Sequence, residues 1–328
     1  MSRSEFDRIA RLTARFGAPP PPDVGIGDDA AVIHPRGALV ATVDAAVEGV
    51  HFHRAFAAMD VLSARAVEAA ASDVAAMGAS FGGGGGLLLS WSLPSWVDDD
   101  VFDALTDGAR RAADRLGAQI LGGNLTGGAS LALHTTALAS LLGVPITRTG
   151  ATPGDRVFVS GPIGAAAIGL QALLAGRDVE ADLAPFVDRW RRPRARVDRA
   201  ADVSSHCRAA IDVSDGLAQD ALHLARASGV AIELAAHRLP MLPHQEEAAA
   251  ALGFEALTLA VSGGEDYELL VTSCEPLPSD RWLEVGAVIE GEGLWVCGRA
   301  GERRRWEGGG WDHFRGERVT SPRRGPRT

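Results

Sequence analysis

Residues 210–217 read Ala-Ile-Asp-Val-Ser-Asp-Gly-Leu. The apolar residues up to Ile211 indicate a short buried strand, and the periodic apolar positions from Leu217 to Ala227 indicate a helix. Asp212 and Asp215 stand between them, where the strand ends and the helix begins. This order of strand, turn and helix is typical of an α/β domain.

The same alternation continues on both sides of this segment. In the second half of the chain it predicts further strands at 156–159, 230–234 and 268–272 and helices at 165–175 and 245–252. In the first half it predicts helices at 5–16, 60–77 and 98–116 and strands at 30–33, 39–43, 87–91, 119–121 and 131–142. We therefore expect an α/β protein whose N-terminal half is α+β.

A turn-rich segment at 145–155 separates the two halves. Because 328 residues exceed the size at which one core usually keeps growing, we predict two domains, at 1–143 and 144–320. An arginine-rich tail at 321–328 is predicted to be disordered. The glycine run 82–86 is predicted to be a flexible turn, and a phosphate cradle is the alternative.

Composition excludes several classes of protein. The formal net charge is -10, which argues against nucleic acid as a partner. All 32 basic residues are arginine, so both the P-loop and the protein-kinase site are excluded, since each requires a lysine. Three cysteines without metal-ligand spacing suit a reducing compartment, and no apolar run approaches the length of a membrane span. We expect a cytoplasmic protein that binds no membrane.

Acidic residues gather in short clusters beside glycine or serine. The clusters are Gly27-Asp28-Asp29, Val43-Asp44, Ser72-Asp73, the 212–216 turn and Gly263-Gly264-Glu265-Asp266. Carboxylates at such turns suit Mg2+, which takes oxygen ligands and bridges to phosphate. We expect acids from these distant stretches to share one pocket in which divalent cations neutralise a phosphate.

Each cluster also has a simpler structural interpretation. Ser214 or Asp215 would cap the predicted helix, and Asp28 and Asp29 would form a surface Asx-turn. Glu265 lies either in a tight turn or where its carboxylate accepts a hydrogen bond from a substrate ring amine. His51 follows an apparent strand end, and a lone histidine is more often structural. Asp73 lies near the predicted end of its helix, where the dipole disfavours a carboxylate and a bound cation would stabilise it.

Several longer motifs together resemble one family. They are Gly-Ile-Gly-Asp-Asp-Ala-Ala-Val-Ile at 25–33, Val-Asp and Glu-Gly-Val-His-Phe within 43–52, Ser-Asp-Val-Ala-Ala-Met-Gly-Ala at 72–79, Ile-Thr-Arg at 146–148, the 210–217 stretch, Ser-Gly-Gly-Glu-Asp-Tyr-Glu-Leu at 262–269 and Trp-Asp-His-Phe at 311–314. In this order and spacing the chain resembles the thiamine-monophosphate kinases, a branch of the aminoimidazole ribonucleotide synthetase superfamily.

The resemblance implies a two-domain aminoimidazole ribonucleotide synthetase-like fold whose N-terminal domain dimerises. It implies a homodimer that moves the γ-phosphoryl group of ATP onto thiamine monophosphate by direct in-line transfer with several Mg2+ ions and no nucleophilic side chain. Position by position, it assigns Mg2+ to Asp29, Thr42, Asp44, Asp73, Asn124, Asp212 and Asp215. It assigns ATP to Gly123, Asn124, Arg148 and Ser214, and thiamine monophosphate to His51, Glu265 and Trp311.

The chain departs from the family pattern at three of these places. Asn124 stands where the family usually has an aspartate, Val43 replaces a hydroxyl residue, and Trp311 stands where tyrosine is common. An amide oxygen still ligates Mg2+ but brings no charge. Two alternatives therefore stay open: a catalytically weak paralogue that binds nucleotide or thiamine phosphate, and another ATP-dependent enzyme of the superfamily. The absence of any cysteine before Cys207 argues against a selenophosphate enzyme.

Overall fold

The computed structural model describes residues 5–26 and 29–306, which form two compact units. The N-terminal unit comprises the described residues up to Val74 together with Ala79–Leu142. The C-terminal unit comprises Ala75–Gly78 and the described residues from Gly143 onward. Trp311 and the tail predicted at 321–328 lie outside the described residues.

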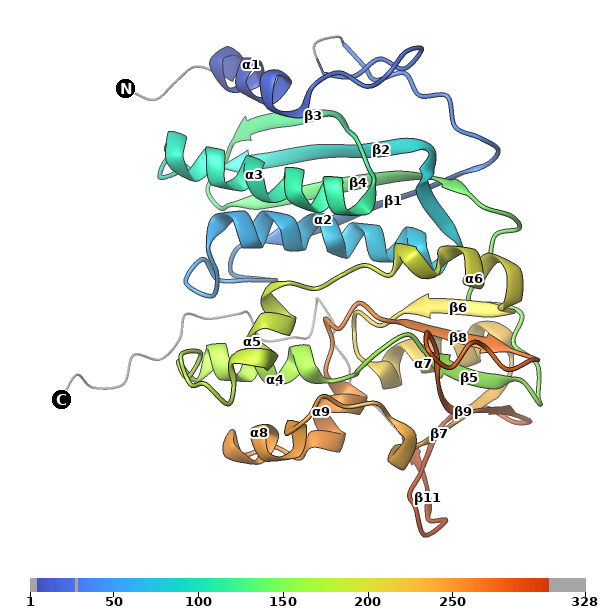
Figure 1. The fold of residues 1–328 in the computed structure, drawn as a ribbon. Coiled ribbons are helices and arrows are strands. Elements are labelled where there is room, and N and C mark those ends of the chain that lie inside the picture. The colour runs from blue at the N-terminus through green and yellow to red at the C-terminus, as the bar shows by residue number, and fades with distance from the viewer. Residues whose placement is uncertain (1–4, 27–28, 307–328) are drawn as a thin grey trace, which may run out of the picture. The chain divides into compact units, whose positions relative to one another are not determined.

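The N-terminal unit is a four-stranded sheet with three described helices (Figure 1). Its elements are α1 (Glu5–Phe16), β1 (Leu39–Val47), α2 (Met59–Ala76), β2 (Ala79–Leu93), α3 (Asp99–Leu116), β3 (Ile120–Gly127) and β4 (Ala132–Leu141). The strand order is β1-β4-β2-β3, with β2 and β3 parallel and the other neighbours antiparallel. The segment predicted as a strand at 30–33 forms only an isolated bridge between Val24 and Val32.

Helices α2 and α3 cover one face of this sheet. Alternate residues of β2 are buried, and the Trp91 ring meets the Phe102 ring of α3 edge-on, with the centroids 6.2 Å apart. The two helices approach closely where a side-chain carbon on Gly108 would lie 1.9 Å from the Asp60 carbonyl oxygen. The opposite face remains more open, because Val43 on β1 is 66% exposed.

The glycine run at 82–86 is part of a strand, so the prediction of a flexible turn is wrong. It continues β2 through a register shift between Ser80 and Gly85 against β4. A side-chain carbon on Gly85 would lie 2.2 Å from the Leu138 carbonyl oxygen. Only glycine therefore lets these backbones approach, and pairing with the neighbouring strand supplies the order that the local sequence lacks.

The C-terminal unit is a seven-stranded sheet with helices. Its elements are β5 (Arg156–Val159), α4 (Ala165–Leu174), α5 (Ala184–Arg191), η1 (Val197–Arg199), α6 (Ala200–His206), β6 (Ala209–Asp212), α7 (Leu217–Ser228), β7 (Ala231–Ala235), η2 (Ala236–Arg238), α8 (Gln245–Ala251), α9 (Ala256–Ser262), β8 (Leu269–Ser273), β9 (Leu283–Ile289), β10 (Gly293–Cys297) and β11 (Arg303–Trp306). The strand order is β11-β10-β7-β9-β5-β8-β6, with β10 and β7 parallel and the other pairs antiparallel.

The core of this unit forms where the apolar face of α7 packs on the sheet. Val157, Ile211 and Leu270 from three strands share one buried cluster with Leu217 and Leu224 of α7. The predicted strand and helix at 210–217 are thus confirmed, and the mixed architecture agrees with the expected fold class. Among the described residues, none of the helices combines the length and the apolar character that a bilayer crossing requires.

Candidate active site

Three predicted metal ligands of the N-terminal unit gather along β1 and α2. The Thr42 hydroxyl donates a hydrogen bond of 2.6 Å to the Asp73 carboxylate. Asp44 lies two positions further along β1, so its side chain leaves the sheet on the same face as that of Thr42. The Asp44 carboxylate accepts a 2.7 Å hydrogen bond from the backbone N–H of Ala45.

Two buried hydroxyls beside these ligands lack a hydrogen-bond partner within the described part of the chain. They belong to Ser72, which precedes Asp73, and to Thr135, which lies directly opposite Asp44 in the β1–β4 register. The side-chain atoms of all these residues that could ligate a metal are oxygens, which Mg2+ prefers. Yet in residues 5–26 and 29–306 no three His, Cys, Asp or Glu side chains come close enough to hold a metal ion together. A pocket shared by all the predicted acids therefore stays a prediction.

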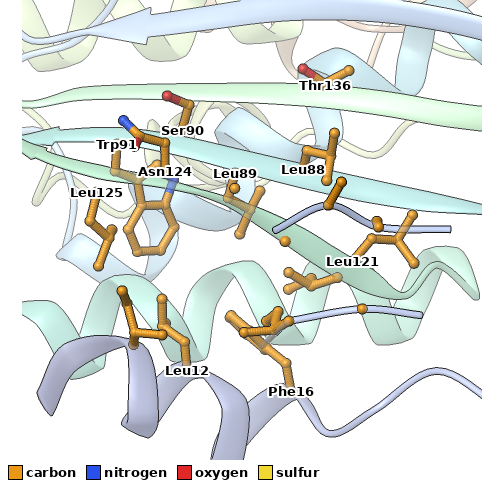
Figure 2. A pocket seen from close by; sticks show the side chains of 18 of the residues that line it. Leu12, Phe16, Leu88, Leu89, Ser90, Trp91, Leu121, Asn124, Leu125 and Thr136 are labelled. Atoms are coloured by element: carbon orange, nitrogen blue, oxygen red, sulfur yellow. The ribbon is translucent and has the colours of Figure 1, made fainter. Parts of the chain in front are cut away.

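A cavity of about 1020 Å3 opens in the N-terminal unit (Figure 2). Its walls are mainly apolar: Leu12 and Phe16 project from α1 on the side of the sheet that carries the Trp91 indole. Ser90 and Asn124 are neighbours across β2 and β3 and lie next to each other on the other side. Three predicted site residues line this cavity: Asp29, Gly123 and Asn124.

Gly123 is required by the backbone at this place. Its φ is +151°, and a side-chain carbon would lie 1.8 Å from the Leu89 carbonyl oxygen. The preceding Gly122 has no such restriction, because the same carbon would meet only the Leu88 side chain, at 3.5 Å. The double glycine therefore lets the β3 backbone pass close to β2 beside the cavity.

In the C-terminal unit, the motifs at 210–217 and 262–269 are locked together. The Glu265 N–H donates to the Ser214 carbonyl at 2.8 Å, and the Tyr267 N–H donates to the Val213 carbonyl at 2.9 Å. A side-chain carbon on Gly264 would lie 2.3 Å from the Ser214 carbonyl oxygen. The glycines of the second motif thus permit the contact that brings Ser214 beside Glu265.

Asp220 organises the turn that carries Asp212 and Asp215. It is 2% exposed, and its carboxylate accepts hydrogen bonds from the backbone N–H groups of Ser214 (3.1 Å) and Asp215 (3.2 Å). Burial, followed by the charges of Asp212 and Asp215, raises the pKa of Asp220 to about 8. Asp220 is therefore mostly protonated at neutral pH, which limits the negative charge that gathers in this turn.

This arrangement differs from the capping that the sequence suggested. The residue at the N-cap position of α7 is Gly216, which has no side chain with which to cap the first turn. Asp220, in the first turn of this helix, instead accepts from the backbone N–H groups of Ser214 and Asp215.

Glu265 has a strained backbone. Its φ is +70° and that of Tyr267 is +51°, and these are two of the three non-glycine residues with positive φ among the described residues. Such conformations cost about 1–3 kcal/mol each, persist where the surrounding structure enforces them, and cluster at functional sites. The Glu265 carboxylate accepts a 2.6 Å hydrogen bond from the indole N–H of Trp190 on α5.

The other two acids of this motif have structural partners. Asp266 is buried and accepts hydrogen bonds from the Gly164 and Ala166 N–H groups at the start of α4. Burial raises its pKa to about 7 despite these bonds. Glu268 accepts a 2.6 Å bond from Ser160 and pairs with Arg189 at 2.9 Å. Asp266 and Glu268 thus hold the motif in place.

Two further predicted site residues, His51 and Arg148, have fewer contacts that indicate a function. The His51 ring accepts a 3.1 Å hydrogen bond from the Val47 N–H, which supports its structural interpretation. Arg148 is exposed, and its carbonyl accepts a bond from the Ser228 hydroxyl.

Sequence reasoning missed Asp220 and Trp190. Asp220 lies in the first turn of α7, close in sequence to the loop at 212–216 that it supports. Trp190 carried no signal, because its partner is 75 residues away.

Comparison with known proteins agrees with this architecture. Residues 27–141 match the family described as "AIR synthase related protein, N-terminal domain", and residues 152–308 match "AIR synthase related protein, C-terminal domain". The two units thus define a protein of the AIR synthase-related class.

A narrower assignment follows from individual relatives. A thiamine-monophosphate kinase of Aquifex aeolicus (strain VF5) is 33% identical over 304 residues, which are 88% of this chain and 92% of the relative. A solved structure described as "AaThiL complexed with AMPPCP and TMP" has a TM-score of 0.78 at 30% identity and covers 96% of this chain and 99% of that one. Hydrogenase maturation protein HypE in complex with ATP, at 17% identity and a TM-score of 0.72 over 93% of this chain and 94% of that one, shares the fold alone. The chain belongs to the thiamine-monophosphate kinase family.

Proposed function

We propose that this protein transfers the γ-phosphoryl group of ATP to thiamine monophosphate, giving thiamine diphosphate and ADP. Membership of the thiamine-monophosphate kinase family, over most of both chains, carries this conclusion. A relative of the same fold is described in complex with AMPPCP and TMP. We interpret AMPPCP as an analogue of ATP and TMP as thiamine monophosphate.

This reaction requires little covalent catalysis by the protein. The acceptor is an oxygen of a phosphate group that is already ionised, so neither a general base nor a nucleophilic side chain is required. Alignment of the two phosphates and neutralisation of their charge supply most of the rate enhancement in phosphoryl transfer. The chain therefore serves the reaction by binding and orienting its substrates.

The oxygen donors of both units suit Mg2+. In the N-terminal unit Thr42, Asp44 and Asp73 would hold it, and the unpaired hydroxyl of Thr135 beside Asp44 supports that fit. Asp29 and Asn124 beside the cavity, and Asp212 and Asp215 in the C-terminal unit, would supply further oxygens. When bound, the ions neutralise negative charge on the transferred phosphoryl group.

The cavity of the N-terminal unit would receive the base of ATP. The Trp91 indole and the side chains of Leu12 and Phe16 form apolar walls against which the flat adenine ring would pack. Ligand pockets are commonly apolar and of this size. Gly123 and Asn124 stand at the polar side of the cavity, where the phosphates would pass. In the C-terminal unit, Arg148 and Ser214 would be ATP contacts.

Thiamine monophosphate would be recognised by Glu265, His51 and Trp311. Glu265 offers a carboxylate to a ring amine, and its strained backbone supports a role beyond packing. The two other acids of its motif are buried against α4 and Arg189, whereas Glu265 is only partly buried and so is the acid that we assign to the substrate.

A homodimer formed through the N-terminal sheet would cover its open face. Val43 is 66% exposed and Leu39 38% exposed on β1, and exposed apolar side chains on a sheet favour association with a second copy. We place the protein in the cytoplasm, where ATP and reduced thiols both occur.

A weakly active or inactive paralogue is the second candidate, favoured by Asn124 and Val43. The two are distinguished by incubating purified protein with ATP, Mg2+ and thiamine monophosphate and separating the products by chromatography. Equal amounts of ADP and thiamine diphosphate support the kinase. Folded protein that binds either substrate but forms no product supports the paralogue.

A further inference from the structure

Helix α5 supports the acidic motif of the C-terminal unit through two consecutive residues. The Trp190 indole N–H donates to the Glu265 carboxylate at 2.6 Å, and the Arg189 guanidinium donates to the Glu268 carboxylate at 2.9 Å. Neither residue lies in a motif that the sequence singled out.

Trp190 fixes the direction of the Glu265 carboxylate. The indole is 0% exposed, so its ring has one orientation, and its N–H is a donor only. A glutamate side chain has three rotatable bonds, and the strained backbone at φ +70° sets only where that side chain starts. The hydrogen bond from a rigid ring therefore restricts where the carboxylate points.

We propose that Trp190 is a positioning residue for recognition of the thiamine moiety: it holds the Glu265 carboxylate in the direction that meets a ring amine of the substrate. The proposal rests on the proposed function, which makes Glu265 a substrate contact. It assigns Trp190 to the binding of one substrate only, and it leaves ATP binding to other residues.

A merely structural tryptophan would behave differently. Loss of core packing would loosen the C-terminal unit as a whole and would not select between two substrates. Val187 provides a matched control, since it lies on the same helix, its side chain is buried at 2% exposure, and its backbone lies against Gly169 of α4. Val187→Ala removes apolar packing from α5 and leaves the Trp190–Glu265 hydrogen bond intact.

The first test compares Michaelis constants. In Trp190→Phe, which keeps the aromatic packing and removes the donor, KM for thiamine monophosphate is expected to rise about tenfold, the effect of one hydrogen bond to a charged group. KM for ATP and kcat are expected to change less than about twofold. Val187→Ala is expected to lower the melting temperature and to leave both KM values within about twofold. An unchanged KM for thiamine monophosphate in Trp190→Phe, or an equal rise in Val187→Ala, overturns the proposal.

A double-mutant cycle tests whether Trp190 acts through Glu265. Affinity for thiamine monophosphate is measured by calorimetry in wild type, Trp190→Phe, Glu265→Gln and the double variant. If Trp190 acts by aiming the carboxylate, its replacement costs about tenfold in wild type and less than about twofold in the Glu265→Gln background. Equal costs in both backgrounds show that Trp190 acts through general packing and contradict the proposal.

A third measurement separates failure of this proposal from failure of the proposed function. The chain has 7 tryptophans, and with 15N-labelled indoles the Trp190 signal is the one that Trp190→Phe removes. Thiamine monophosphate added to the wild-type protein should shift this signal, whether or not product forms. Turnover without any such shift refutes the role of Trp190 alone. A shift without turnover refutes the kinase and supports the positioning role, and absence of both refutes the two together.

Discussion

Replacement of Gly123 by alanine should damage both the N-terminal sheet and nucleotide binding. The added carbon would lie 1.8 Å from the Leu89 carbonyl oxygen, about half of an ordinary contact distance, so β2 and β3 must move apart. Overpacking of this kind costs about 1–3 kcal/mol, and a non-glycine residue at φ +151° adds about 1–3 kcal/mol. We expect a loss of about 3 kcal/mol in the free energy of unfolding.

The adjacent glycine supplies the control for this experiment. In Gly122→Ala the added carbon meets only the Leu88 side chain at 3.5 Å, which is an ordinary contact. We expect its stability to lie within about 0.5 kcal/mol of wild type. Both variants have the same chemical change in the same strand, so their difference isolates the close approach at Gly123.

Urea unfolding followed by circular dichroism gives the free energies, and calorimetry with ATP and Mg2+ gives the affinities. Gly123→Ala should melt about 10 °C lower and bind ATP at least about tenfold more weakly, because moving β2 and β3 apart displaces the backbone that lines the cavity. Gly122→Ala should match wild type in stability. Equal stability of the two variants would refute the argument from backbone approach, and unchanged ATP affinity in a destabilised Gly123→Ala would refute the placement of the nucleotide.

Four further changes test other parts of the account. Asp44→Asn removes a ligand charge without emptying the core, so the rate should fall at least about a hundredfold while the urea midpoint stays constant, and undiminished turnover would remove the ligand assignment. Asn124→Asp adds the charge that the amide lacks and should lower the Mg2+ concentration for half-maximal rate; a higher requirement counts against its role. Burial raises the pKa of Asp266 from 3.8 to about 7, so the folded state favours the protonated acid. As the pH rises from about 4 to about 7, the free energy of unfolding of the wild type should therefore fall relative to that of Asp266→Asn. A difference between the two proteins that does not change with pH would contradict this. If the proposed dimer forms through the open sheet face, Val43→Asp places a charge in its interface and should lower the mass measured by light scattering from that of a dimer to that of a monomer. A dimeric mass in both wild type and variant would exclude this face as the interface.

Local signals in the sequence were sufficient for many elements of the fold. The helix α3 has both of its ends encoded: Asp98 accepts a hydrogen bond from the Val101 N–H at the start, and Gly117 adopts φ +67° at the end. The strand and helix on either side of the 212–216 turn follow from the apolar pattern alone. Each of these elements depends on residues that are neighbours along the chain.

Elements that depend on distant partners were missed or misjudged. The glycine run in β2 has no strand propensity of its own and is ordered by pairing with β4. The helix α5 was not predicted, and its contact from Trp190 to Glu265 joins residues 75 positions apart.

For the candidate site, the sequence singled out residues of possible function but not the residues that hold them in place. Ser214 and Glu265 were both singled out, and the structure brings their backbones within 2.8 Å. The supporting role of Asp220, and the use of Asp266 and Glu268 to anchor the loop, required coordinates. A carboxylate that caps a helix and one that meets a substrate have the same appearance in a sequence.

The most direct test of the central claim is product formation as a function of Mg2+ concentration, with ATP and thiamine monophosphate in excess and metal-free protein as the starting point. The account predicts no thiamine diphosphate without the ion, and with it a rise to a plateau in which one ADP accompanies each thiamine diphosphate. Folded protein that yields no thiamine diphosphate at any Mg2+ concentration, or ADP without thiamine diphosphate, would contradict it.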